Sequence, residues 1–238
     1  PTDGVIFLDV DTDPLNPIYL GEWNDFYVHD GMVRGDTMYV GCVYEGDLYV
    51  VDVSNKSNPQ NLGNIGTPND FTHNAWVSDN GDYVFTTDEK SDAYIGSYDI
   101  SDLNNIQEVD RIQSNAGSNS IPHNVHVDGN FLITSYYRDG TVVHDITHPN
   151  NLIQVASFDS SPLTGDGFDG CWGTYPYLPS GNIISSDINS GSGNNGRLVG
   201  YSFLLSSSKS LNTLLIIMLN SCFLYKRNSI FIFINKFN

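Results

Sequence analysis

The chain has 238 residues, of which 28 are acidic and only 10 are basic, and its formal net charge is −18. All acidic residues precede Tyr201, whereas only six of the basic residues do. Such an acidic surface repels phosphate backbones, which argues against nucleic-acid binding and is consistent with a simple role in solubility. Aromatic residues make up 12% of the chain, and apolar runs before Tyr201 stay too short for helices. The composition therefore predicts an all-β protein.

Short β-prone runs separated by turn residues begin at the N-terminus. The opening unit, about residues 1–25, contains two runs, at 5–9 and 17–23. The second unit, about residues 26–68, contains four runs, at 28–33, 37–43, 47–53 and 61–65. The third unit, about residues 69–114, has turn residues at 79–82 and 89–92, where hairpins are expected.

The fourth unit, about residues 115–160, shows the pattern most completely. Its four runs lie at 123–127, 131–136, 141–145 and 152–158. Gly129 and Gly140 stand in its first two turns, where residues that tolerate positive φ favour hairpins. The fifth unit, about residues 161–202, has longer connections and three runs, at 169–174, 182–187 and 198–202.

One aspartate recurs in each of the first four units, at the end of a β-prone run. The four residues are separated by 43, 47 and 46 positions: Asp9, Asp52, Asp99 and Asp145. A period of about 40–50 residues is that of a four-stranded propeller blade. We expect a β-propeller of four-stranded antiparallel blades over residues 1–202, incomplete, with about four to five blades represented. Carboxylates at strand ends accept hydrogen bonds from the following turn, so a structural role is expected for the series.

A second motif opens the units. It contains His29, His73 and His123 in the second to fourth units, and Asp169 stands at the corresponding place in the fifth. The first strand of a propeller blade lines the central channel, so these four side chains are expected to form an axial ring. The histidines are candidate ligands for Zn, Cu or Fe. The favoured interpretation is structural: each histidine hydrogen-bonds the backbone of a neighbouring blade, because a repeated residue more often belongs to the repeat unit than to a unique site.

Other candidate sites are weaker. Asp166 and Asp169 lie in a glycine-rich acidic turn that would suit a surface Ca²⁺ ion, although a plain acidic turn is the simpler interpretation. The cysteines show no metal-type spacing and predict no disulfide framework; Cys42 and Cys171 fall in β-prone runs and are expected to be buried. No nucleophile-elbow, zinc-protease or phosphate-loop motif occurs.

Residues 203–238 depart from everything before them. They contain no Gly, Pro, Asp, Glu, His or Trp. The apolar stretch at 211–225 is shorter than the roughly 20 residues of a membrane span and is interrupted by polar residues. We expect this tail to lie outside the fold and not to attach the protein to a membrane.

The strand motif resembles the LVIVD repeat. The resemblance is carried by residues 5–9, 48–52 and 141–145, each an apolar run that ends in Asp and is followed by Val or Ile and a turn. The pattern is similar to the secreted choice-of-anchor B proteins, regarded as β-propellers, and covers about residues 4–201. Extracellular or cell-surface localisation is what this resemblance implies, although the family's export and anchoring regions are not in this sequence. It supplies no catalytic residues.

Three functions remain open at this stage. The favoured one is a non-catalytic extracytoplasmic scaffold for binding or adhesion, which presents its loops and axial channel to a protein or glycan. The second is a metal-dependent enzyme that uses the histidine ring. The third is a glycan-cleaving propeller, whose acid and base come from different blades and leave no pattern in the sequence.

Overall fold

The computed structural model describes residues 3–159, 161–188 and 197–201. Within these residues the chain forms seventeen β-strands and no helix. The strands make five antiparallel sheets, of which three have four strands, one has three and one has two. The predicted all-β class and the four-stranded antiparallel sheets are therefore confirmed.

Each sheet is a meander of strands that are adjacent in sequence. The first two sheets are formed by β1 (Val5–Asp9) and β2 (Ile18–Trp23), and by β3 (Asp30–Arg34), β4 (Thr37–Cys42), β5 (Asp47–Asp52) and β6 (Gln60–Gly66). The third is formed by β7 (Thr72–Val77), β8 (Tyr83–Asp88), β9 (Ile95–Asp99) and β10 (Gln107–Ile112). The fourth is formed by β11 (Asn124–Asp128), β12 (Phe131–Tyr136), β13 (Gly140–Asp145) and β14 (Ile153–Phe158). The fifth is formed by β15 (Gly170–Tyr175), β16 (Ile183–Ile188) and β17 (Arg197–Tyr201).

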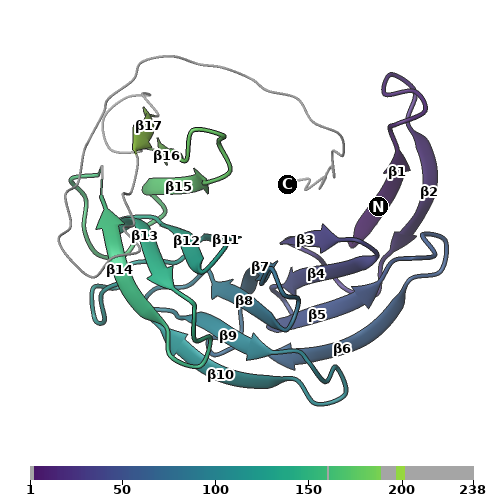
Figure 1. Ribbon diagram of the computed structural model, residues 1–238, viewed down its shortest axis with the longest axis horizontal. Coiled ribbons are helices and arrows are strands. Elements are labelled where there is room, and N and C mark those ends of the chain that lie inside the picture. Colours follow the sequence, from purple (N-terminus) through teal and green to yellow (C-terminus); the bar gives the residue numbers. More distant parts are fainter. Residues whose placement is uncertain (1–2, 160, 189–196, 202–238) are drawn as a thin grey trace.

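The five sheets follow one another around an arc, as the blades of a propeller do (Figure 1). Strands β3, β7, β11 and β15 lie on the inner side of the arc, and β6, β10 and β14 lie on the outer side. The fold is thus β-propeller-like, and the described strands form no closed sheet. The tail at 203–238 lies outside the described residues. Among the residues that are described, no helix is long and apolar enough to cross a membrane.

Neighbouring blades are held together by apolar side chains that alternate between the two faces of each sheet. On β5, Val51 packs with Phe7 of the preceding sheet, whereas the adjacent Val50 packs with Val84 of the following one. Because side chains alternate between the two faces along a strand, each middle strand contributes to two hydrophobic cores. Burying one such side chain contributes about 1.5–3 kcal/mol, so apolar side chains on both faces of the middle strands stabilise the packing of neighbouring blades.

Burial is greatest on the middle strands of the four-stranded blades and least on the outer strands. Strands β4, β8 and β12 are buried at nearly every position, while β6 and β14 are largely exposed. The predicted burial of Cys42 and Cys171 is confirmed, and both are free thiols. Polar side chains are also buried, among them several on β7, β8 and β12, where hydrophobic packing cannot explain them.

Candidate functional site

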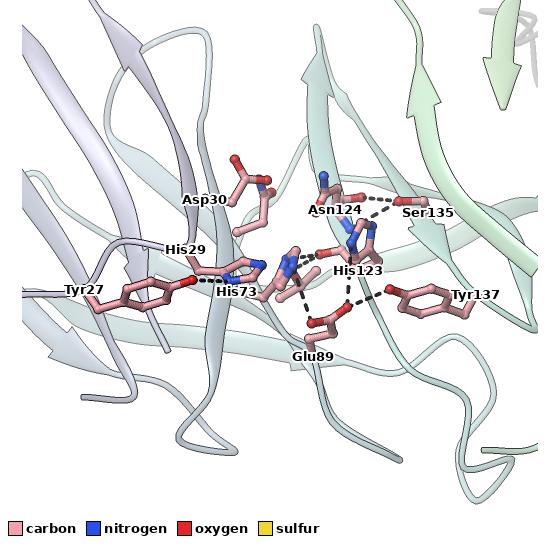
Figure 2. A network of polar contacts seen from close by, with 11 residues as sticks. Tyr27, His29, Asp30, His73, Glu89, His123, Asn124, Ser135 and Tyr137 are labelled. Atoms are coloured by element: carbon pink, nitrogen blue, oxygen red, sulfur yellow. Dashed lines mark hydrogen bonds and ion pairs between the residues drawn. The ribbon is translucent and has the colours of Figure 1, made fainter. Parts of the chain in front are cut away.

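Three histidines from successive blades meet on the inner side of the arc. His29 directly precedes β3, His73 lies in β7, and His123 directly precedes β11. The ring centroids of His29 and His73 are 4.3 Å apart, and those of His73 and His123 are 4.5 Å apart. Figure 2 shows the three imidazoles side by side. The structure therefore brings together the three histidines of the repeated motif.

The fifth blade places Trp172, rather than Asp169, next to this row. In β7 a bulge falls at His73, because Thr72 pairs with Asp88 and Asn74 pairs with Thr87. In β15 the same kind of bulge falls at Trp172, between Cys171 and Gly173. The Trp172 ring lies 5.3 Å from that of His123. The shared bulge therefore aligns Trp172 with His73, whereas matching the motifs by sequence places Asp169, three residues earlier, at this position.

Asp169 instead forms an ion pair with Arg138, whose Nη2 lies 2.8 Å from its Oδ2. The same guanidinium donates to the carbonyl oxygen of Thr164, 3.0 Å away. A cation from the protein therefore already balances Asp169, while Asp166 is exposed. This arrangement gives the surface Ca²⁺ hypothesis no geometric support.

Glu89, which the sequence did not single out, completes the cluster. It directly follows β8. Its Oε2 lies 3.4 Å from Nε2 of His73, and its Oε1 lies 3.6 Å from Nε2 of His123. The hydroxyl of Tyr137 donates to Oε1 over 2.7 Å. We call His29, His73, His123 and Glu89 the histidine cluster (Figure 2).

Burial sets the charge of the cluster. It lowers the pKa of His73 well below the ordinary value and that of His123 to about 4, and it lowers the pKa of His29 as well. The three imidazoles are therefore neutral at pH 7. Burial also raises the pKa of Glu89, and the hydrogen bond from Tyr137 acts against that rise. Neutral imidazoles next to a carboxylate can accept protons, donate hydrogen bonds or bind a cation.

Hydrogen bonds between blades orient the imidazoles. Nδ1 of His73 lies 3.1 Å from the carbonyl oxygen of His123, which also accepts a hydrogen bond from the Thr87 hydroxyl. Because a carbonyl only accepts, Nδ1 carries the proton and Nε2, the nitrogen that faces Glu89, has its lone pair available. The hydroxyl of Tyr27 lies 3.4 Å from Nδ1 of His29. The contact of His73 fits the structural role that the sequence left open, and it still leaves Nε2 for another partner.

The residues that follow the histidines link the blades in a second row. Asn74 donates to Oδ2 of Asp30 over 3.0 Å and accepts a hydrogen bond from the backbone N–H of Val125, also over 3.0 Å. Burial raises the pKa of the Asp30 carboxyl. This row fixes the spacing of the inner strands and hence the distances within the histidine cluster.

Aromatic side chains surround the cluster. Tyr27 packs against Tyr44, with ring centroids 4.8 Å apart, and Tyr137 packs against Phe168, with centroids 5.5 Å apart. Three of the rings are largely open to solvent: Tyr44 is 77% exposed, Phe168 58% and Trp172 50%. We call Tyr27, Tyr44, Tyr137, Phe168 and Trp172 the aromatic rim. It places exposed apolar rings around a polar centre.

The repeated aspartates make local contacts. In each, Oδ1 accepts a hydrogen bond of 2.7–2.9 Å from the backbone N–H two residues later, for Asp9, Asp52, Asp99 and Asp145. Hydrogen bonds from the Ser54 and Ser101 hydroxyls, together with these backbone bonds, lower the pKa of the carboxyls of Asp52 and Asp99, and the backbone bond from Asp11 lowers that of Asp9. The geometry is that expected of a structural turn residue, away from the histidine cluster.

Comparison with known proteins supports the fold alone. No family model and no curated protein matches the chain. It is similar to a solved protein from Lactobacillus plantarum, with a TM-score of 0.67 and 14% identity over 90% of this chain and 63% of the other. It is also similar to Kuenenia stuttgartiensis hydrazine synthase, with a TM-score of 0.58 and 15% identity over 84% of this chain and 57% of the other.

A computationally designed protein, Ika4, is similar as well, with a TM-score of 0.54 and 12% identity over 76% of this chain and 94% of the other. The chain spans about three fifths of the length of the two natural proteins. The neighbours and the antiparallel sheets together identify a β-propeller-like fold.

Proposed function

We propose that this protein is a non-catalytic binding module that holds a glycan on the inner side of its arc, where the aromatic rim surrounds the histidine cluster. The observation that carries the proposal is the exposure of Tyr44, Phe168 and Trp172 beside buried polar groups. Sites for small and medium-sized ligands combine apolar walls with a few converging polar groups. The proposal includes an extracellular or cell-surface location, which rests on the resemblance to choice-of-anchor B proteins.

The chemistry of the rim suits a sugar. A sugar ring has an apolar face and hydroxyl groups around its edge. An aromatic ring offers a flat apolar surface to the apolar face. Glu89 and the neutral imidazoles offer hydrogen-bond acceptors to the hydroxyl groups of the sugar. Since acidic residues outnumber basic ones 28 to 10, the expected glycan is neutral or cationic rather than sulfated or phosphorylated.

A glycan array followed by titration calorimetry tests the proposal. The wild-type protein is expected to bind at least one neutral or amino-sugar glycan, and Trp172→Ala is expected to weaken binding at least tenfold. Tyr19→Ala is the matched control, because Tyr19 is similarly exposed, at 58%, but lies on β2, away from the cluster. An array without any bound glycan, or equal losses in both variants, would refute the proposal.

A metal-dependent activity is the second candidate, and one observation favours it. His29, His73 and Glu89 each offer a ligand atom, and these atoms all lie within 4.8 Å of one another. The third candidate, glycan cleavage, needs two carboxyl groups that act together across the sugar. The contacts of Glu89 are to His73, His123 and Tyr137, so they give that candidate no support.

A further inference from the structure

We propose that His29, His73 and Glu89 bind one divalent transition-metal ion of the zinc class, with a coordination position left open toward the aromatic rim. This site goes beyond glycan binding, since it requires no sugar. The ligand set of two imidazoles and one carboxylate is one that catalytic zinc sites use, with water or a substrate in the fourth position. Carboxylate and imidazole donors also suit Co²⁺ and Mn²⁺.

The distances within the site fit a metal. The candidate ligand atoms of the three residues lie within 4.8 Å of one another. Bonds of about 2.0–2.1 Å in a tetrahedral site put neighbouring ligand atoms roughly 3.3–3.4 Å apart. Nε2 of His73 and Oε2 of Glu89 are already 3.4 Å apart. Binding therefore requires small side-chain shifts and no change in the blades.

Hydrogen bonds around the site present the correct atoms. His73 uses Nδ1 for the carbonyl oxygen of His123, which turns Nε2 toward Glu89. Tyr137 donates to Oε1 of Glu89, which leaves Oε2 facing His73. Metal-binding histidines nearly always donate their second nitrogen to a carbonyl or carboxylate, and metal-binding carboxylates are hydrogen-bonded in turn. Both features are present here.

The charge of the site calls for a cation. The Glu89 side chain is 13% exposed and lies among imidazoles. The Lys and Arg ion pairs of the described residues are made with other carboxylates, Asp36, Asp79, Glu108 and Asp169. A carboxylate buried without a cationic partner is costly, and a divalent ion would balance it.

The open position follows from burial. The side chains of His73 and His123 are almost fully buried, at 3% and 5% exposed, so the site is closed to solvent on their side. His29 is only half-buried and lies beside Tyr27 of the rim. A ligand at the rim would therefore reach the ion from the side of His29 and Glu89.

Cobalt titration of chelator-treated protein tests the site. We expect one Co²⁺ per chain, with the visible absorption of a four-coordinate cobalt–imidazole site, and displacement of Co²⁺ by Zn²⁺. Glu89→Gln and His29→Gln should each weaken binding at least about tenfold. His148→Gln is the control, because His148 is exposed and outside the site, and it should bind like the wild type.

Three results would overturn the proposal: no one-to-one cobalt binding by the wild type, wild-type affinity in Glu89→Gln, or an equal loss in His148→Gln. Circular dichroism of each variant checks that the sheets are intact. Trp172→Ala separates this inference from glycan binding, since it should keep Co²⁺ affinity while losing the glycan. The two proposals can thus fail independently.

Discussion

An aspartate and a histidine recur in successive blades, and the structure uses them in opposite ways. The repeated aspartate bonds to the turn that follows it within two or three residues, as in Asp99 and the N–H of Ser101, 2.9 Å away. The histidine at the start of the first strand contacts the next blade, as in His73 and His123. The aspartates are spread over the surface, one per blade, whereas the histidines converge on one point.

The contrast shows how a repeat creates a site. A local contact is complete within one blade and stays the same in every copy. A contact toward the centre of the arc joins side chains of different blades, so one additional side chain there changes the environment of the whole histidine cluster. Glu89, which His73 and His123 both approach, is such a group. We therefore expect substitutions at the histidines to affect stability more than substitutions at the aspartates.

The largest expected effect is that of His73→Ala. His73 is 2% exposed, and its loss leaves a cavity between two blades and removes the hydrogen bond to the His123 carbonyl. We expect the free energy of unfolding to fall by about 2–4 kcal/mol, as for other buried large-to-small changes that remove a hydrogen bond. Urea denaturation in metal-free buffer at pH 7.5 measures this.

His148→Ala serves as the control for this measurement. His148 is exposed, so its replacement should change the free energy of unfolding by less than about 0.5 kcal/mol. If His73→Ala were no more destabilising than His148→Ala, the histidine cluster would not hold the blades together.

The next expected effect is on the pH dependence of stability, and it comes from His144, a buried histidine on β13 outside the histidine cluster. Burial lowers its pKa from 6.5 to about 4, and neither ring nitrogen has a hydrogen-bond partner among the described residues. The unfolded chain therefore binds the proton more readily. The contribution of a neutral His144 to stability is complete above pH 6.5 and is lost as the pH falls from 6.5 through about 4.

Replacing His144 with leucine should make stability less sensitive to acid. Between pH 7.5 and pH 5, the loss in the free energy of unfolding should be smaller in His144→Leu than in the wild type by up to about 2 kcal/mol. Urea denaturation at the two pH values gives the comparison. An identical acid sensitivity in both proteins would mean that His144 already binds a proton in the folded state.

Much of the fold follows from local chemistry in the sequence. The turn glycines and the aspartate period predict blades of four strands, because each signal acts within a few residues. The convergence of His29, His73 and His123 follows from their place at the start of each unit. Glu89 has no repeated pattern. It lies beside His73 because β8 pairs with β7 in the same blade, and His123 comes from the next blade. Trp172 was missed because the bulge that aligns it with His73 is visible in the strand pairing and not in the sequence.

A smaller effect is expected for Tyr137→Phe, which tests the link between the cluster and the rim. The change removes one donor, whose bond to Glu89 is 2.7 Å long, without removing the ring that packs against Phe168. We expect a loss of about 1 kcal/mol and a further rise in the pKa of Glu89, because the bond stabilises its charged form. Urea denaturation measures the first, and carboxyl titration by NMR the second. An unchanged Glu89 titration would exclude this bond in solution.

The smallest effect is expected for Asp99→Ala. Asp99 lies at the surface, and its carboxylate bonds only to Ser101, through its N–H at 2.9 Å and its hydroxyl at 2.6 Å. Solvent can replace both bonds, so we expect the free energy of unfolding at pH 7 to fall by less than about 1 kcal/mol. Because the bonds lower the carboxyl pKa, this loss should vanish as the pH falls through the lowered value. Denaturation at pH 7 and pH 2.5 measures both. A loss as large as that of His73→Ala would mean that the turns hold the blades together as firmly as the central contacts do.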